Sequence, residues 1–428
     1  MSRFIFIANS KSFELEITGS TEEETTVNTY WVLSPFVTSM NQETGAAQVA
    51  YYQQNTEELR ERVRDIVTQI KHLNPRINRL TDYFEKELTP NEWFFLSVDE
   101  ALHPEDTDKI LAELMKIGAD EKMEKQINGT IEILHKIREV YDIYTFGEYT
   151  KACIGEPDKN KRVCRYCHRS MPEVSFKKTA HTISEALGNK HIKTNDECDE
   201  CNQSFGDTIE QDFLSLFDVP RLIFGIKNKE GYPHKFIGDN YSIEKDANGN
   251  LKIGYRMKDS ETIPQIDNFL QKVMLTPHRS FPEQNIYKAL CKYIFGVLDN
   301  NTILNFERTR KWLNGENKEV ALPQIARFYH PEVVAHPHIT LYVRKKDARR
   351  DLPHVVAEIR IINLAFVVIL PLSEQDICAY NEVQDYQRFW DFFDVYNKVA
   401  GWQFSYCNGL ESKHPTVLIK FTENKENK

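Results

Sequence analysis

Two closely spaced pairs of cysteines are the residues of this chain that most directly suggest chemistry. Cys164 and Cys167 form one Cys-x-x-Cys pair, Cys198 and Cys201 form another, and thirty residues separate the two pairs. Zinc prefers four thiolate or imidazole ligands in a tetrahedron, and each Cys-x-x-Cys turn presents two sulfurs to one ion. A redox motif would need a single pair at the start of a helix. We therefore predict that the four cysteines bind one structural zinc ion.

A histidine, His181, lies between the two pairs in a segment of unusual charge. From residue 151 to 193 there are ten Lys and Arg against four acids, whereas residues 194–218 contain eight acids and no Lys or Arg. A basic loop suits contacts to phosphate, and an acidic segment suits a divalent cation.

The elements expected around His181 form a strand, a turn, a second strand and a helix. Residues 175–189 predict a strand that turns at Gly188-Asn189 and returns. After Cys201 the chain predicts a helix, since apolar residues recur at near-helical spacing: Phe205, Ile209, Phe213 and Leu216.

This ββα order resembles the HNH endonucleases, in the subset whose ββα-metal core is braced by a four-cysteine zinc. The resemblance covers roughly 55 of the 428 residues. It implies that His181 is the general base that takes a proton from the attacking water. It also implies that Asn202, directly after the last cysteine, helps to hold a catalytic Mg²⁺ or Mn²⁺ ion. An asparagine between them would orient the histidine, and both Asn189 and Asn195 qualify.

One position departs from the family pattern. Many members carry Asp or Glu directly before the histidine as a metal ligand, whereas this chain has Ala180. Another carboxylate would have to contact the ion. Asp199 lies three residues before Asn202, and Glu185 lies four residues after the histidine, so both are candidates.

The segments on either side predict mixed α/β domains. We expect an N-terminal domain over residues 1–150, the HNH module over 151–218, and over 219–428 a C-terminal domain with a sensing, regulatory or oligomerising role. The fold class is therefore α+β, with a central ββα-metal zinc module inserted between α/β domains. The expected elements are strands at 3–8, 13–18, 339–344, within 354–370 and at 416–421, helices at 56–73, 127–141 and 283–298, a hairpin at 241–257 turning at Asn248-Gly249, and a disordered tail at 422–428.

Composition is typical of an ordinary soluble globular protein. Its formal net charge of −10 argues against a general coat of positive charge for nucleic acid, although a local basic patch is compatible with it. The N-terminal apolar run is too short for a signal peptide, and the longest apolar run, residues 361–372, is about half a membrane span. We expect a cytoplasmic location, no membrane association, and cysteines that bind metal rather than form disulfides.

These observations predict a metal-dependent HNH endonuclease that hydrolyses phosphodiester bonds, with double-stranded DNA as the partner. A bacterial anti-phage effector is the role expected by analogy, controlled by a regulatory protein or ligand. Because one ββα site cuts one strand, a double-strand break requires a homodimer or larger assembly. The alternative is a catalytically degenerate, zinc-stabilised protein that binds nucleic acid or regulates, and Ala180 is the residue that keeps this alternative open.

Overall fold

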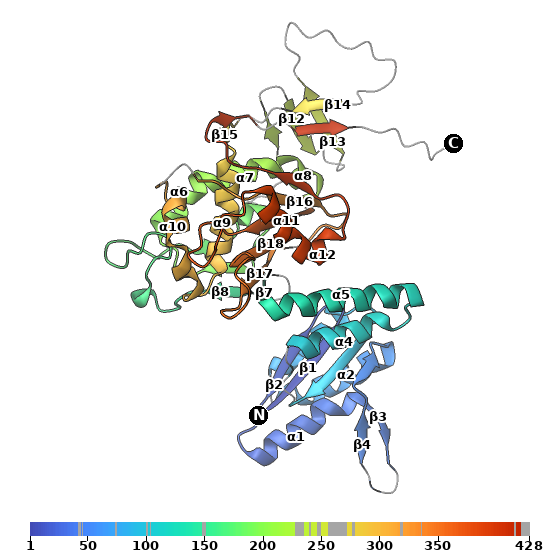
Figure 1. Cartoon of the computed structure of the whole chain (residues 1–428). Coiled ribbons are helices and arrows are strands. Elements are labelled where there is room, and N and C mark those ends of the chain that lie inside the picture. The colour runs from blue at the N-terminus through green and yellow to red at the C-terminus, as the bar shows by residue number, and fades with distance from the viewer. Residues whose placement is uncertain are drawn as a thin grey trace. The chain divides into compact units, whose positions relative to one another are not determined.

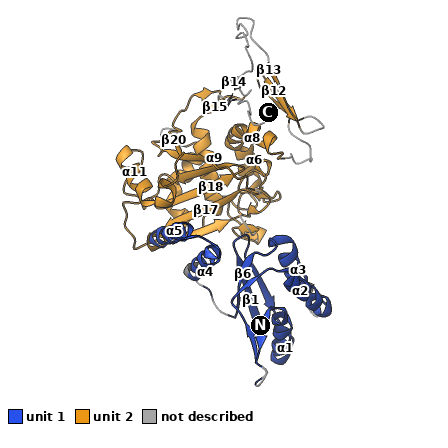
Figure 2. Cartoon of the chain, turned by 90° about the vertical axis from the view of Figure 1, so that its right-hand side faces the viewer, with its two compact units in different colours: residues 1–137 blue, residues 138–428 orange. Residues whose placement is uncertain are grey.

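The computed structural model of the chain separates into two compact units, residues 1–137 and 138–428 (Figures 1 and 2). Both units mix helices and strands, which confirms the α+β class. The residues predicted to form the module, 151–218, lie within the second unit, and their insertion between separate flanking domains stays a prediction. The structure describes residues 1–41, 44, 46–72, 75–99, 102, 104–147, 151–226, 235–238, 241–245, 250–255, 272–275, 279–316, 320–334, 336–414 and 417–420.

The first unit is built on an antiparallel sheet in the order β2-β1-β6-β5. Both faces of this sheet are covered. Phe4 and Phe6 of β1 pack with α1, α2 and α3, whereas Ile5 and Ile7 pack with α4 on the opposite face. The predicted strands at 3–8 and 13–18 and the helix at 56–73 are confirmed. The elements of this unit are β1 (Ser2–Ala8), β2 (Phe13–Ile17), α1 (Glu22–Leu33), β3 (Val37–Met40), β4 (Ala47–Val49), β5 (Tyr52–Gln54), α2 (Glu57–Ile70), α3 (Asn78–Asp82), β6 (Trp93–Val98), α4 (Pro104–Lys116) and α5 (Glu121–Val140), which ends just past the boundary.

The second unit contains a six-stranded antiparallel sheet in the order β20-β16-β19-β18-β17-β7. Its strands are β7 (Tyr141–Phe146), β16 (Ile325–Tyr329), β17 (His338–Arg344), β18 (Val355–Ile361), β19 (Leu364–Ile369) and β20 (Gln403–Ser405). The apolar run at 354–370 forms two strands, because Ile362 adopts a positive φ of 57° and turns the chain back. Tyr141, which the helical spacing assigned to the preceding helix, instead begins β7, where its hydroxyl donates to the carbonyl of Pro353.

Helix α9 (Gln284–Val297) is the central helix of this unit, and it confirms the helix predicted at 283–298 (Figure 2). One buried apolar cluster contains residues of α9, of the six-stranded sheet and of the cysteine region. The cysteine region is therefore packed into the second unit through α9.

The remaining elements surround this core. They are β8 (Ala152–Ile154), β9 (Ala180–His181), β10 (Ile192–Thr194), α6 (Asp199–Asp207), α7 (Ile209–Leu214), α8 (Asp218–Ile223), β11 (Phe236–Ile237), β12 (Tyr241–Lys245), β13 (Leu251–Tyr255), β14 (Lys272–Leu275), β15 (Phe281–Pro282), α10 (Glu307–Leu313), α11 (Val383–Phe392), α12 (Asp394–Asn397), β21 (Ser412–Lys413) and β22 (Val417–Lys420). Strands β12 and β13 pair as the predicted hairpin. Its expected turn at Asn248-Gly249 and the tail at 422–428 lie outside the described residues. Among the residues that the structure describes, no helix combines the length and apolar character needed to span a membrane.

Candidate active site

The four cysteines converge as their spacing predicts. The sulfur atoms of Cys164, Cys167, Cys198 and Cys201 all lie within 4.8 Å of one another. Backbone amides donate hydrogen bonds to two of the sulfurs. The amide of Cys198 donates to the sulfur of Cys164 at 3.4 Å, and the amide of Cys201 donates to the sulfur of Cys198 at 3.5 Å. Hydrogen bonds from the Cys164 and Cys201 thiols lower the pKa of Cys198. Four sulfurs so placed can hold one metal ion, and thiolates are the ligands that zinc prefers.

The turn that carries the first cysteine pair is fixed by its own backbone. The amide of Cys164 donates to the carbonyl of Arg169, and the amide of His168 donates back to the carbonyl of Cys164. His168 adopts a positive φ of 57°, which lets the chain reverse after the second cysteine of the pair. The second pair lies at the start of α6, where Cys198 is the N-cap residue.

His181 lies in β9, the two-residue edge strand of a three-stranded sheet ordered β8-β10-β9. The predicted first strand is thus shorter than expected, and a 3₁₀ turn at Glu185–Leu187 ends in Gly188 with a φ of +91°. In the register, His181 pairs with Lys193 of β10, which in turn pairs with Cys153 of β8. Residues directly opposite one another in a sheet share a face. His181 therefore shares a face with a lysine and with the exposed Cys153.

The opposite face of this small sheet packs against α9. The hydroxyls of Thr182 and Thr194 lie 2.6 Å apart, and Thr194 also donates to the carbonyl of Gly296. A Cβ atom on Gly296 would stand only 2.6 Å from the Thr182 side chain, so a glycine is needed there for the close approach. Helix α9 therefore covers one face of the β8-β10-β9 sheet, and His181 lies on the other face.

The two candidate middle asparagines have different environments. Asn189 is fully buried, and its amide donates to the carbonyls of Ile183 and Ile192 while its oxygen accepts from the amides of His191 and Ile192. Both donors and both lone pairs of this side chain are thus engaged by the backbone of the loop.

Asn195 continues the ladder just past β10, since its amide donates to the carbonyl of Ile154 at 2.7 Å. Alternation along the strand places its half-buried side chain on the same face as Lys193, and hence on the face of His181. Asn202, also half-buried, lies in the first turn of α6, and its amide donates to the carbonyl of Cys198.

The two candidate carboxylates also differ. Asp199 accepts hydrogen bonds from the Ser175 hydroxyl at 2.5 Å and from the amides of Lys177 and Lys178 at 3.0 and 2.8 Å. Burial alone would raise the pKa of Asp199, but these hydrogen bonds outweigh it and lower the pKa. Asp199 thus caps the turn at 175–178. Glu185 is half-buried in the 3₁₀ turn after β9, and Ala180 is buried.

Three buried charged residues that sequence reasoning missed lie directly behind His181. The ammonium of Lys292 on α9 lies within 3.3 Å of carboxylate oxygens of Glu197 and Glu210. The only signal in the sequence was the presence of Lys288 and Lys292 in a largely apolar helical run, which is also typical of an amphipathic surface helix.

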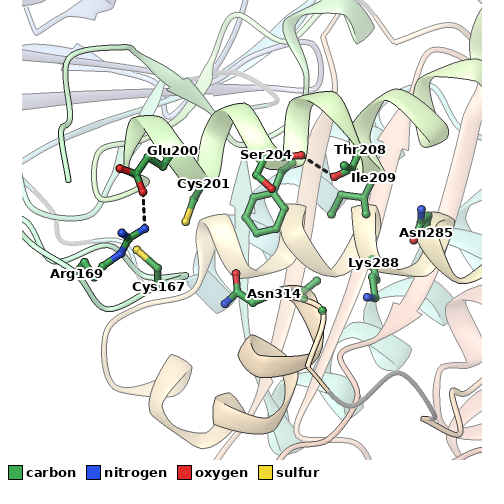
Figure 3. A pocket seen from close by; sticks show the side chains of 13 residues that line it. Cys167, Arg169, Glu200, Cys201, Ser204, Thr208, Ile209, Asn285, Lys288 and Asn314 are labelled. Atoms are coloured by element: carbon green, nitrogen blue, oxygen red, sulfur yellow. Dashed lines mark hydrogen bonds and ion pairs between the residues drawn. The ribbon is translucent and has the colours of Figure 1, made fainter. Parts of the chain in front are cut away.

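A cavity of about 500 Å³ lies beside the cysteine cluster, between α6 and α9 (Figure 3). Its lining includes Cys167, Arg169, Glu200, Asn285 and Lys288. Two of these lining residues, Arg169 and Glu200, form an ion pair at 2.5 Å (Figure 3). Helix geometry places Glu200 and Asp199 about 100° apart on α6, so the cavity borders a different side of that helix from the one that contacts the turn at 175–178.

Comparison with known protein families identifies this region. Residues 164–218 match the family model described as HNH endonuclease. These residues form an HNH domain. The match starts at the first cysteine of the cluster and includes His181 and the whole of α6, so the predicted resemblance is confirmed. No curated protein and no solved structure matches the chain. The HNH domain supports nuclease activity, a nucleic-acid substrate and metal binding.

Proposed function

We propose that the chain is a metal-dependent endonuclease that hydrolyses phosphodiester bonds in double-stranded DNA. The observation that carries this proposal is the position of His181, inside the matched HNH domain and on the face of the β8-β10-β9 sheet that α9 leaves open. Lys193 shares this face and adds a positive charge suited to a phosphate backbone.

In the proposed reaction, His181 accepts the proton of the water that attacks the scissile phosphorus. Of the two middle asparagines, we assign the orienting role to Asn195, because it shares the face of His181 while the side chain of Asn189 is fully used by the loop backbone. Asn189 instead holds the shape of the loop between the two strands. A general base so positioned contributes on the order of 10²–10⁴-fold to the rate.

The proposal includes a structural Zn²⁺ at the four cysteines and a catalytic Mg²⁺ or Mn²⁺. Asn202 would hold the catalytic ion, which when bound stabilises the charge on the phosphate and on the leaving oxygen. Of the two candidate acids we favour Glu185, since Asp199 is engaged by three donors. Within the described part of the chain, the four cysteines are the sole group of three or more His, Cys, Asp or Glu side chains placed to share an ion. Phosphate oxygens and waters would therefore complete the catalytic site.

The test is cleavage of supercoiled plasmid with Mg²⁺ or Mn²⁺ by the wild type and by His181→Ala. We expect cleavage by the wild type, and a variant that keeps its fold and its zinc but loses nearly all activity. Equal rates for the two proteins would refute the role of His181. A wild type that binds DNA without cutting it would favour the degenerate, nucleic-acid-binding alternative, which the buried Ala180 supports.

We further propose that two copies act together on a duplex. One HNH domain supplies one histidine, and the two strands of DNA run antiparallel, so a double-strand break needs two sites related by a near two-fold axis. At limiting enzyme, a homodimer should yield linear plasmid, whereas a monomer should yield nicked circles. Light scattering on the same sample gives the mass, and linear product from a strictly monomeric protein would contradict the proposal.

The proposed setting is the bacterial cytoplasm, with phage DNA as the target and a regulatory protein or ligand as the control. All eight cysteines lie in the described residues and none forms a disulfide, which suits a reducing compartment. Expression of the wild type should lower the plating efficiency of phages on a bacterial host, and His181→Ala should not. Equal plating on both strains across a broad phage panel would contradict the defensive role and leave the nuclease chemistry untouched.

A further inference from the structure

Lys292 lies in the middle of α9, far along the chain from the HNH domain, and its side chain has no solvent exposure. Its ammonium lies 3.2 Å from the carbonyl oxygen of His181 and 3.3 Å from that of Thr182. A single cation thus contacts the backbone of the proposed general base and that of the next residue.

The same ammonium contacts two acids from separate elements. Its nitrogen lies 3.3 Å from Oε2 of Glu197, which directly precedes Cys198, and 3.3 Å from Oε1 of Glu210 on α7. Both carboxylates are buried, with 0% and 9% of their side chains exposed. Placing three charged groups in the interior is a poor source of stability, because desolvation opposes their attraction. Their contacts do, however, join strand β9, the second cysteine pair and α7 at one point.

The helix that carries Lys292 is itself held firmly against the HNH domain. The hydroxyl of Tyr166, inside the first cysteine pair, donates to the carbonyl of Lys292 at 3.1 Å. One turn further along, Gly296 allows the helix to touch Thr182 and Thr194 directly. These contacts therefore hold the ammonium of Lys292 in a defined position beside β9.

We infer that Lys292 is a positioning residue for the proposed nuclease, which sets the direction of the His181 imidazole by fixing the carbonyls of His181 and Thr182. Strand β9 is only two residues long and lies at the edge of its sheet, so it has few bonds of its own to define its orientation. The expected effect on catalysis rests on the proposed function. The expected effect on the structure of β9 rests on the contacts of Lys292 alone.

The test compares two variants. Lys292→Met removes the ammonium but leaves two buried acids without a cation. The triple variant Lys292→Met/Glu197→Gln/Glu210→Gln removes all three charges and is designed to fold even where the single variant does not. Lys288→Met is the matched control, since Lys288 is a largely buried lysine one turn earlier on α9, with its ammonium over the Trp312 ring.

For the folded, zinc-loaded triple variant we expect kcat for oligonucleotide cleavage to fall on the order of a hundred-fold. A loss of this size is typical when a catalytic group is slightly misplaced. KM should stay close to the wild-type value, because no substrate contact is removed. The control should cleave at nearly the wild-type rate. Wild-type kcat in the triple variant, or loss of its zinc and fold, would overturn the inference.

Hydrogen exchange separates this inference from the proposed function. The amide of Thr182, which donates to the carbonyl of Ile192, should exchange faster in the triple variant than in the wild type, while amides of the six-stranded sheet should not change. This measurement requires no cleavage. If the wild type proves inactive but Thr182 loses protection, the nuclease proposal fails and the positioning contact stands. Unchanged protection of Thr182 would overturn the contact itself.

Discussion

Arg165 and Asp196 form a buried, bidentate ion pair that joins the two cysteine pairs of the HNH domain. Arg165 Nε donates to Oδ1 of Asp196 at 2.7 Å, and its second nitrogen donates to Oδ2 at 3.0 Å. The same guanidinium donates to the carbonyls of Phe295 and Leu298, at the end of α9. One side chain, Arg165, therefore links the two cysteine pairs to each other and to the end of α9.

We predict that Arg165→Met lowers the free energy of unfolding of the second unit by about 3–5 kcal/mol, because it leaves a buried carboxylate and two carbonyls without their donor. Chemical denaturation followed by circular dichroism measures this. Lys398→Met is the control, since its exposed ion pair with Asp394 contributes less than about 1 kcal/mol. A cost for Arg165→Met no larger than that of the control would mean that the pair does not stabilise the unit.

Zinc analysis tests the cysteine cluster directly. The purified protein should contain about one zinc ion per chain, because four thiolates complete one tetrahedral site. Cys198→Ser should lose both the ion and thermal stability, since binding energy at such a site is partly folding energy. Cys153→Ser, an exposed cysteine in β8, should retain both. A folded protein with full thermal stability and no bound metal would contradict the assignment.

The convergence of the four cysteines was predictable from the sequence because their spacing is local, whereas the residues that support the site were not. Each Cys-x-x-Cys turn brings two sulfurs close together, and the two pairs meet in the structure. Lys292 contacts Glu197 and Glu210 across more than eighty residues, and no spacing pattern in one sequence predicts contacts between residues so far apart. The choice between two asparagines depended on strand register, which short strands do not reveal in sequence.

The two middle asparagines should therefore separate stability from cleavage. Asn189→Ala should lower the free energy of unfolding on the order of 2–4 kcal/mol, because it removes four hydrogen bonds to the backbone of a buried loop. Asn195→Ala should change stability little and lower the cleavage rate. Thermal melts and plasmid cleavage on the same samples distinguish the two effects. The opposite pattern would return the orienting role to Asn189.

The two carboxylates near the proposed cation should respond differently to neutralisation. Asp199→Asn should lower stability, because an amide cannot accept all three hydrogen bonds that cap the turn at 175–178. Glu185→Gln should raise the Mn²⁺ concentration needed for half-maximal cleavage. A Mn²⁺ titration of both variants is the measurement. A metal requirement shifted only in folded Asp199→Asn would identify that residue as the ligand.

His354 should make the second unit less stable in mild acid. Burial, reinforced by the charge of Arg344, lowers the pKa of His354 from 6.5 to about 4, and the ring stacks on Phe306 while Nδ1 lies 2.8 Å from the Ser373 hydroxyl. Between these two pKa values the unfolded chain binds a proton that the folded protein does not, so stability falls as pH drops through this window. From pH 7 to pH 5 the loss should be about 2 kcal/mol. His354→Gln should show a smaller loss over the same range, because the other titrating groups are unchanged in it. Equal pH dependence in denaturant titrations of the two proteins would mean that His354 is not the group responsible.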